Sequence, residues 1–344
     1  MTIASEISRI NTNIENAYTA CNNKGATIPS TQNSANLATC IGTITVGSDA
    51  DIKKEIVNGV LETSPNVTSY TLPNGATDVG DYGLCGAYAG STAITAADLS
   101  NLTSATGYLG MQYSFLNCTN LASVNLNNLR TITGYYFFSN AFKGCTSLTS
   151  INLSSLETIV PGASISNGGA LYSAFQGCTG LTSADFSGLT TVTTNQAFNN
   201  AFSGCTNLAS VSFSNLTQIG ATSNLSTTNY GHFSGAFNGC SALTTLSFPK
   251  LEAIYCTGGT TTSYGTFYNC NKIQKLYFPK LSIITYSAGA SSTNQNAYKN
   301  IFSNCSSLTE IHFAAANQSA IEANGGYATL WGRGAGNATV YFDL

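Results

Sequence analysis

Residues 175–186 read Phe175-Gln-Gly-Cys178-Thr-Gly-Leu181-Thr-Ser-Ala-Asp-Phe186, and six other stretches of the chain repeat this spacing. In each, Cys follows Phe by three positions, and Leu or Ile follows Cys by three more. The seven sets are Phe115/Cys118/Leu121, Phe142/Cys145/Leu148, Phe175/Cys178/Leu181, Phe202/Cys205/Leu208, Phe237/Cys240/Leu243, Phe267/Cys270/Ile273 and Phe302/Cys305/Leu308. Seven copies with one internal spacing predict a solenoid, in which each copy forms one coil.

The second half of each copy predicts a short strand. Apolar residues stand six and eight positions after every Cys, as Ala184 and Phe186 do, with polar residues between them. Such alternation is typical of a strand with one face turned inward. A single strand cannot bury that face, so stacked copies are expected to form a parallel sheet over a shared core. The first six copies add Leu eleven and Ile or Val fourteen positions after Cys, which predicts a second short extended piece.

The first half of each copy predicts a tight corner. The residue before Cys is Gly or Asn in all seven copies, for example Gly177 and Asn304, which indicates a left-handed backbone there. Five copies also carry an apolar residue four positions before Phe, such as Phe198 before Phe202, and this spacing favours a helical turn. We therefore expect each coil to contain a helical turn, a corner, a strand, a second extended piece and a loop.

These residues resemble the BspA-type leucine-rich repeat. The resemblance covers about residues 67–316, and it includes a degenerate first copy, Tyr88-Ala-Gly-Ser-Thr-Ala-Ile94, that lacks Phe and Cys. It implies a repeat solenoid that is mainly β, with short helical turns. The chain departs from the family in length, because its Cys-to-Cys intervals are 27, 33, 27, 35, 30 and 35 residues. We therefore expect insertions in the outer half of each coil.

The column of cysteines could bind metal, form disulfides or fill the core. Zinc sites require close Cys or His ligands, but the chain has no Cys-x-x-Cys and only two histidines, His232 and His312. Side chains stacked in parallel seldom meet the dihedral requirement of a disulfide. We interpret these cysteines as small, buried, reduced core residues. We expect neither a metal nor a cofactor.

The N-terminal segment carries a stripe of isoleucines at heptad spacing, formed by Ile3, Ile7, Ile10 and Ile14. Isoleucine at both core positions of a coiled coil shifts the preference toward trimers or tetramers, so we expect a homotrimer. The alternative is that the stripe packs within the chain, against a second helix around Leu37 and Ile41.

The pattern divides the chain into four parts. Residues 1–46 form a helical attachment or oligomerisation segment, 47–66 a linker helix, 67–316 the solenoid and 317–344 a C-terminal cap. A short helix around residues 314–323 and a last strand around 337–342 are expected to cover the open end of the core. The opening of the chain, residues 3–29, is similar to that of phage and prophage tail-associated proteins, and this resemblance implies attachment to a virion.

Composition excludes several classes of function. Charged residues make up 8% of the chain and the net charge is −3, which argues against a nucleic-acid binder. No apolar run reaches the length of a membrane span, and the start lacks the pattern of a signal peptide, so we expect neither membrane insertion nor classical secretion.

The sequence shows no nucleophile elbow, phosphate loop or zinc helix. We expect no catalytic residues, and therefore a protein that binds rather than catalyses.

Ligand contacts are expected in six variable segments between the copies, which are rich in Ser, Thr, Asn, Gly and Tyr. The segments are 133–141, 160–174, 193–201, 220–236, 255–266 and 285–301. The candidate ligand-binding residues are Tyr135, Tyr136, Tyr230, His232, Tyr255 and Tyr286. Packing between neighbouring loops is the alternative role for the tyrosines. Tyr172, Tyr264 and Tyr298 lie closer to the motif and are expected in the core, and Trp331 is expected to pack in the cap.

These observations lead to a functional hypothesis. We expect a phage virion protein, associated with the tail or the head, that is made in the bacterial cytoplasm. Its N-terminal segment would bind a virion partner, and its solenoid would present loops to a host cell-surface glycan or protein. The alternative is a bacterial surface adhesin or protein-interaction scaffold of the BspA kind.

Overall fold

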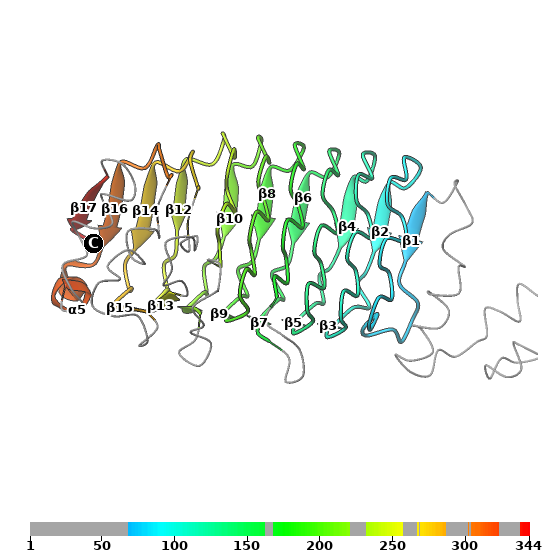
Figure 1. Ribbon diagram of the computed structural model, residues 1–344, viewed down its shortest axis with the longest axis horizontal. Coiled ribbons are helices and arrows are strands. Elements are labelled where there is room, and N and C mark those ends of the chain that lie inside the picture. The colour runs from blue at the N-terminus through cyan, green and yellow to red at the C-terminus, as the bar shows by residue number, and fades with distance from the viewer. Residues whose placement is uncertain are drawn as a thin grey trace, which may run out of the picture.

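The computed structural model describes residues 68–161, 168–220, 232–256, 267, 269–286, 302, 304–322 and 338–344. In these residues the chain winds into a row of coils that follow one another along a single axis (Figure 1). The predicted helical segment 1–46, with Ile3, Ile7, Ile10 and Ile14, and the linker helix 47–66 lie outside the described residues.

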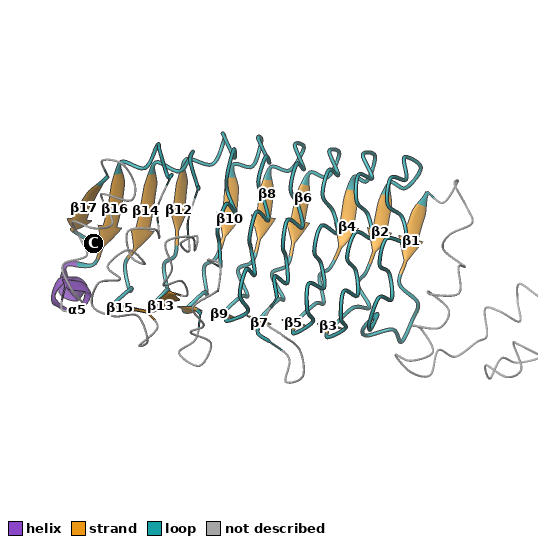
Figure 2. Ribbon diagram, viewed as in Figure 1, coloured by secondary structure: helices purple, strands orange, loops and turns teal. Residues whose placement is uncertain are grey.

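The first strand of each coil lies parallel to the first strands of its neighbours (Figure 2). These strands are β1 (Ser69–Thr71), β2 (Ala96–Asp98), β4 (Ser123–Asn125), β6 (Ser150–Asn152), β8 (Ser183–Asp185), β10 (Ser210–Ser212), β12 (Thr245–Ser247), β14 (Lys275–Phe278), β16 (Glu310–Phe313) and β17 (Thr339–Phe342). They form three sheets, in the orders β1-β2-β4, β10-β8-β6 and β12-β14-β16-β17. Equivalent residues pair, as Ala184 does with Val211, which confirms the predicted parallel stacking.

The second extended piece is also a strand. These strands are β3 (Ser104–Ala105), β5 (Thr131–Ile132), β7 (Thr158–Ile159), β9 (Thr191–Val192), β11 (Gln218–Ile219), β13 (Ala253–Cys256) and β15 (Ile283–Tyr286). They form one seven-stranded parallel sheet. Apolar residues of this sheet such as Ile159 and Val192 are fully buried, whereas Ile283 at the start of β15 is exposed. The predicted extended piece is therefore confirmed.

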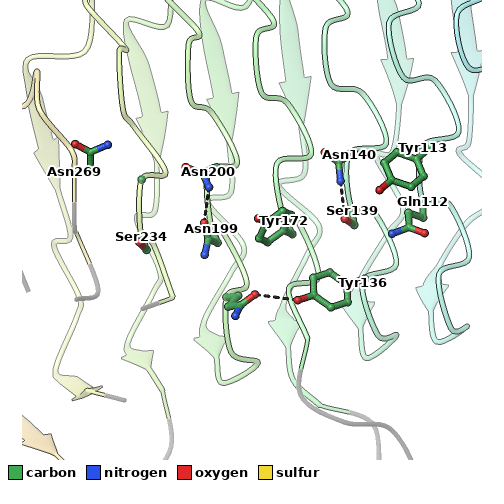
Figure 3. A pocket seen from close by; sticks show the side chains of 12 residues that line it. Gln112, Tyr113, Tyr136, Ser139, Asn140, Tyr172, Asn199, Asn200, Ser234 and Asn269 are labelled. Carbon is green, nitrogen blue, oxygen red and sulfur yellow. Dashed lines mark hydrogen bonds between the residues drawn. The ribbon is translucent and has the colours of Figure 1, made fainter. Parts of the chain in front are cut away.

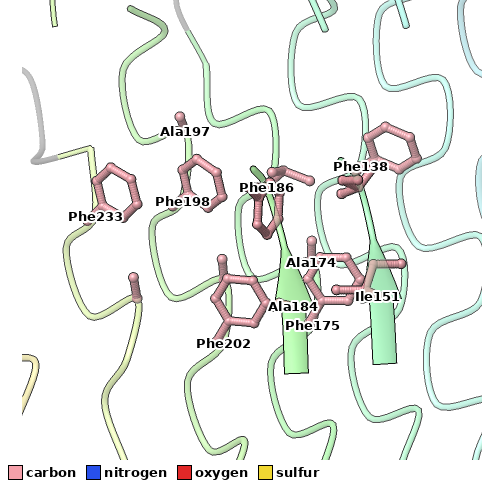
Figure 4. Close-up of a cluster of buried hydrophobic side chains, with 14 of the residues drawn as sticks. Phe138, Ile151, Ala174, Phe175, Ala184, Phe186, Ala197, Phe198, Phe202 and Phe233 are labelled. Carbon is pink, nitrogen blue, oxygen red and sulfur yellow. The ribbon is translucent and has the colours of Figure 1, made fainter. Parts of the chain in front are cut away.

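Columns of phenylalanines run through the buried core, which also contains aliphatic and cysteine side chains (Figure 4). In the column of motif phenylalanines, the rings of Phe142 and Phe175 stack at 5.5 Å and those of Phe175 and Phe202 at 5.4 Å. In the strand column, Phe186 stacks on Phe213 at 5.5 Å. Burying one such side chain stabilises the fold by roughly 1.5–3 kcal/mol.

The degenerate first copy takes part in the same core. Tyr88 stacks on Phe115 at 5.3 Å and an interplanar angle of 6°, so Tyr88 occupies the place of the motif phenylalanine. Ile94, at the place of the motif leucine, is fully buried. The core therefore begins one copy before the first Phe-x-x-Cys-x-x-Leu stretch.

The predicted helical turns are wrong for the copies from Cys118 to Cys240, whose turn segments the structure describes, because the residues before Cys form a chain of β-turns there. In the copy that begins at Phe175, the N–H of Cys178 donates to the carbonyl of Phe175, and the N–H of Leu181 donates to that of Cys178. The three-residue spacing of the motif is thus the span of a β-turn. The residue before Cys has a positive φ in all seven copies, from 58° at Asn117 to 77° at Gly204. A type II turn requires this conformation at its third residue, which explains the Gly and Asn there.

Hydrogen bonds between coils replace those of a helix in these turn segments. Alternate N–H groups donate to carbonyls of the next coil, for example Phe142 to Ala174 and Gly177 to Ser203. In the described turn segments, from residues 82–90 to 198–204, such bonds run from each coil toward the coil that follows it in sequence. We call the surface formed by these segments the turn side.

The motif cysteines are buried and reduced, and their thiols bind backbone. Each Sγ lies within donor distance of a carbonyl in the preceding coil, as Cys178 Sγ does at 3.0 Å from Phe142 O and Cys205 Sγ at 3.0 Å from Phe175 O. The cysteines among the described residues are free thiols. The interpretation as core residues is therefore confirmed, with the addition of a specific hydrogen bond.

The C-terminal part contains the expected short helix and last strand. Helix α5 (Gln318–Glu322) follows the 3-10 turn η2 (Ala315–Asn317) and buries Ile321, and β17 extends the sheet beside β16. Trp331 lies outside the described residues. Within the described part of the chain, no helix has the length and apolar character to span a bilayer.

Candidate functional site

A groove on the turn side crosses six consecutive coils (Figure 3). It has a volume of about 640 Å³ and is lined by Gln112, Tyr113, Tyr136, Ser139, Asn140, Tyr172, Gln196, Asn199, Asn200, Ser234, Gly235 and Asn269. We call it the amide–tyrosine groove. Since parallel strands lie about 4.8 Å apart, five steps between these coils give the groove a length of about 24 Å.

Nine of the twelve residues that line the groove come from two neighbouring positions of the coil. Six residues before Cys stand Gln112, Ser139, Tyr172, Asn199 and Ser234, and five residues before Cys stand Tyr113, Asn140, Ser173, Asn200 and Gly235. The second set has a left-handed backbone throughout, with φ between 51° and 63°. Non-glycine residues in this conformation cost free energy and persist only where the surrounding structure holds them. The ladder of hydrogen bonds to the next coil provides that restraint.

Hydrogen bonds orient two pairs of neighbouring polar side chains in the groove, Ser139 with Asn140 and Asn199 with Asn200. Asn140 Nδ2 donates to Ser139 Oγ at 2.9 Å, and Asn200 Nδ2 donates to Asn199 Oδ1 at 2.7 Å. Asn199 lines the groove although it is only 7% exposed. Polar groups held in this way are ordered before any ligand arrives.

A row of tyrosines leads along the turn side into the groove. The tyrosine ladder consists of Tyr82, Tyr108, Tyr135, Tyr136 and Tyr172. Tyr108 and Tyr135 stack at 5.1 Å and an angle of 1°, whereas Tyr135 and Tyr136 meet edge to face at 4.6 Å. Tyr82 is 51% exposed and Tyr108 is 36% exposed. Exposed aromatic rings of this size are the kind of side chain that dominates binding surfaces.

Tyr136 and Gln196 form a strap along one side of the groove (Figure 3). The hydroxyl of Tyr136 donates to Gln196 Oε1 at 3.0 Å. The coil between them makes room with two glycines: a Cβ on Gly168 would lie 2.6 Å from the Tyr135 ring, and one on Gly169 would lie 2.7 Å from the Gln196 carbonyl oxygen. Larger residues there would displace the rings or the backbone.

The groove carries no charge on the described residues that line it. The ion pair between Arg130 and Glu157, at 2.7 Å, involves two side chains outside this lining. Amides and hydroxyls both donate and accept hydrogen bonds, and tyrosine rings add apolar contact area. The groove is therefore suited to bind a neutral polar ligand.

The buried thiols are not poised for nucleophilic chemistry. Burial raises the pKa of Cys118 to about 11 and that of Cys240 to about 12, and it raises the pKa of Cys178 as well. A thiol that stays protonated at neutral pH is a poor nucleophile and a poor metal ligand. Among the described residues, no group of three or more His, Cys, Asp and Glu side chains could hold a metal ion.

A second hollow lies on the strand side, across β8, β10 and β12. Serines and a threonine, including Ser183, Ser210 and Thr245, line it together with apolar atoms, and its volume is about 580 Å³. It coincides with the break between two of the sheets, since β10 and β12 belong to different ones. Its polar side chains are short hydroxyls, with one carboxylate, Asp185, and it has no aromatic ring from Tyr or Trp.

The structure brings together two of the predicted contact residues. Tyr135 and Tyr136 are half-buried neighbours in the tyrosine ladder, and Tyr136 also lines the groove. Tyr255 lies in β13, where its backbone pairs with Thr285, and it does not line the groove. Tyr230 lies outside the described residues, and only the backbone of Tyr286 is described.

The prediction that His232 contacts a ligand conflicts with its burial. Its side chain is fully buried, its Nδ1 donates to the carbonyl of Thr194 at 3.0 Å, and its Nε2 has no partner. Burial lowers its pKa to about 4, so the ring is neutral near pH 7. The position stands eight residues before Cys, a column filled elsewhere by Phe137, Ala170 and Ala197, all of them buried.

The prediction that Tyr172 belongs to the core is also wrong, because its half-buried ring lines the groove. The amides were not predicted as site residues, although Gln112, Gln196 and Asn199 line the groove together with the tyrosines. A signal was available: counted back from Cys, the outward positions carry Asn, Gln, Ser or Tyr in copy after copy.

The chain matches one known family. Residues 43–163, 139–234 and 233–324 match the BspA type Leucine rich repeat region, which covers well over half of the chain. No curated protein matches it. Among solved structures, a leucine-rich repeat protein of T. pallidum is 22% identical with a TM-score of 0.29, over 52% of this chain and 78% of that chain. A leucine-rich repeat protein from Eubacterium ventriosum is 14% identical with a TM-score of 0.34, over 75% of this chain and 63% of that chain. With its seven Phe-x-x-Cys copies and its parallel coils, the chain belongs to the family of BspA-type leucine-rich-repeat proteins.

Proposed function

We propose that this protein is a non-enzymatic adhesion protein that binds a cell-surface ligand through the turn side of its solenoid. The amide–tyrosine groove carries this proposal, because it is an uncharged concave surface that runs across six coils and continues into the tyrosine ladder. Concave sites with aromatic walls and a few oriented polar groups are typical of binding sites. Membership of the BspA-type leucine-rich-repeat family is consistent with a role in protein interaction or adhesion.

We further propose that the protein belongs to a phage virion, where it would contact the host. The similarity of residues 3–29 to phage tail-associated proteins supports this setting. The N-terminal segment would then attach the protein to a virion partner, and Ile3, Ile7, Ile10 and Ile14 would join three copies.

Mass spectrometry of purified virions tests the setting, and absence of the protein from particles would exclude it. An adsorption assay tests the function: purified protein is added to host cells before phage, and bound protein is measured on the cells. We expect it to bind cells and to reduce phage adsorption. A Tyr136→Ala variant, which removes a groove wall, should lose both effects while its circular dichroism stays unchanged.

The trimer has its own test. Sedimentation equilibrium should give three times the mass of one chain, and replacing Ile7 and Ile10 with Asp should give a single chain. Equal masses for the two proteins would assign the isoleucine stripe to packing within the chain.

Membership of the BspA-type family favours a second candidate, a bacterial surface adhesin or interaction scaffold. Detection of the protein on intact bacteria that carry no prophage genes beside its own gene would support this candidate over the phage protein. The groove would serve the same purpose in both settings.

A further inference from the structure

We infer that the groove binds a neutral, extended glycan chain that lies along the solenoid axis. This inference rests on the proposed function, because it names the ligand of the same groove. The proposed ligand is a glycan and not a protein, and a neutral polymer and not a charged one.

The chemistry of the lining selects a neutral glycan. The described lining consists of Tyr, Asn, Gln, Ser and Gly, with no charged side chain and no Leu, Ile, Val or Phe. A charged polymer would be desolvated there without a counter-charge. A peptide groove would present apolar pockets or an open strand edge, and this lining has neither. Sugar hydroxyls both donate and accept hydrogen bonds, as side-chain amides do.

The spacing of the lining selects an extended chain. Asn140 and Asn200 stand two coils apart at the same position, five residues before Cys. Tyr113 and Tyr172 also stand two coils apart, at the neighbouring positions five and six residues before Cys. Two spacings of about 4.8 Å place like side chains about 10 Å apart along the axis. A chain whose alternate sugar units present opposite faces, as β-1,4-linked chains do, would meet rings and amides in alternation.

The amides are ordered in advance of binding. Asn199 is more than nine-tenths buried and lines the groove, and its Oδ1 accepts a hydrogen bond from Asn200 Nδ2. Among the described residues Asn199 Nδ2 has no acceptor, which leaves a donor for a ligand oxygen. Gly235 permits this arrangement, because a Cβ there would lie 2.3 Å from Asn200 Oδ1.

Isothermal titration calorimetry with defined oligosaccharides tests the inference. The probes are β-1,4-linked glucose, mannose and N-acetylglucosamine oligomers of two to eight units, with polygalacturonate oligomers as the charged comparison. We expect at least one neutral series to bind, with affinity that rises with length until the groove is filled. Binding only to the charged series, or to none of them, would overturn the inference.

One substitution isolates the ligand contact. Asn199→Asp keeps the oxygen that accepts from Asn200 and removes the free N–H donors, so affinity for the neutral oligomer should fall about tenfold or more. Asn152→Asp is the matched control on the strand side, where Asp185 already stands at the equivalent position. Asn152→Asp should bind as the parent does. Equal affinities for all three proteins would overturn the inference.

A second variant covers the case in which Asn199→Asp does not fold. Tyr113 is 40% exposed and has a φ of 59°, and Asn stands at the same position in two other coils. Tyr113→Asn should therefore fold normally and still bind the oligomer several-fold more weakly. Unchanged affinity would exclude a ligand over this ring.

The cell assay separates this inference from the proposed function. Protein that binds host cells, but whose binding survives enzymatic removal of surface glycans and is unaffected by Asn199→Asp, has a different ligand, and the adhesion function still stands. Protein that binds neither cells nor oligosaccharides contradicts both.

Discussion

Tyr136 donates its phenolic hydrogen to Gln196 Oε1 at 3.0 Å, although the two residues stand 60 positions apart and a complete coil lies between them. Most contacts in the described solenoid join neighbouring coils, so this strap is a connection of a different kind. It closes over the backbone at Gly168 and Gly169, and it fixes one wall of the groove.

The first prediction concerns the energy of the strap. Tyr136→Phe removes the hydroxyl, and Gln196→Ala removes its acceptor, so each should lower the free energy of unfolding by about 0.5–1.5 kcal/mol. The double variant should lose less free energy of unfolding than the two single variants together, because the second substitution has no hydrogen bond left to remove. Urea denaturation of the four proteins measures this coupling. Strictly additive losses would mean that the hydrogen bond does not contribute in solution.

The second prediction concerns Gly168. A methyl group there would lie 2.6 Å from a ring carbon of Tyr135 and 2.9 Å from one of Tyr136, so Gly168→Ala should displace both rings. The expected results are a changed near-ultraviolet circular dichroism spectrum and weaker ligand binding.

Gly86→Ala is the control for an added methyl group. Gly86 has a φ of 69° and open space around its Cα, so alanine should cost about 1–2 kcal/mol of backbone strain without moving a tyrosine. The same near-ultraviolet change in both variants would argue against a local effect on the ladder.

The third prediction concerns the cysteine column. Cys178→Ala removes one of two donors to the carbonyl of Phe142, which still accepts from the N–H of Cys145, and it creates a small cavity. The loss of stability should be about 1–2 kcal/mol. Cys178→Ser retains a donor and should recover part of the loss.

Ligand affinity gives a separate readout for this column. Both variants should bind as the parent does, because Cys178 is fully buried and does not line the groove. If Cys178→Ala, or the equivalent Cys205→Ala, abolished binding while the fold remained intact, the binding surface would lie elsewhere.

The fourth prediction concerns acid stability. Burial lowers the pKa of His232 to about 4, from 6.5 for an unburied histidine, so the unfolded chain binds a proton more readily than the folded one. The stability that neutral His232 contributes is present above pH 6.5 and is lost as the pH falls through 4. The full difference is about 3 kcal/mol.

His232→Asn isolates this contribution from that of the carboxylates. Asparagine can still donate to the carbonyl of Thr194 but does not titrate. The stability of the variant should therefore fall less between pH 7 and pH 4 than that of the parent, as measured by thermal unfolding. Parallel curves would show that His232 is not buried as a neutral ring in solution.

The coil itself could be predicted from sequence because its determinants are local and repeated. Alternation of apolar residues around Ala184 and Phe186 defines the first strand, and Gly177 before Cys178 defines the corner. The wrong element was the helical turn. Apolar residues at spacings of three and four fit a helix and a chain of β-turns equally well. The choice depends on hydrogen bonds to the next coil, such as that from Phe142 to Ala174, which a local pattern does not contain.

The groove was harder to predict because it depends on register between coils of unequal length. Tyr136 appeared as a candidate because it is a tyrosine in a variable segment, but its partner Gln196 becomes visible only when both are counted back from Cys. The same count places His232 in a buried column and Tyr172 in an outward one. Residue type alone misassigned both, and position relative to Cys would have assigned both correctly.

The forward direction of the turn-side hydrogen bonds also bears on how the molecule is made. In the described coils the donors of one coil find their acceptors in the coil that follows it, as Gly177 does in Ser203. During synthesis a newly emerged coil therefore exposes a row of N–H groups that stay bonded to water until the ribosome has delivered about thirty more residues. Each new coil provides the carbonyl acceptors for the N–H groups of the coil before it, and exposes unpaired N–H groups of its own. The order of translation is therefore the order in which these turn-side hydrogen bonds are completed.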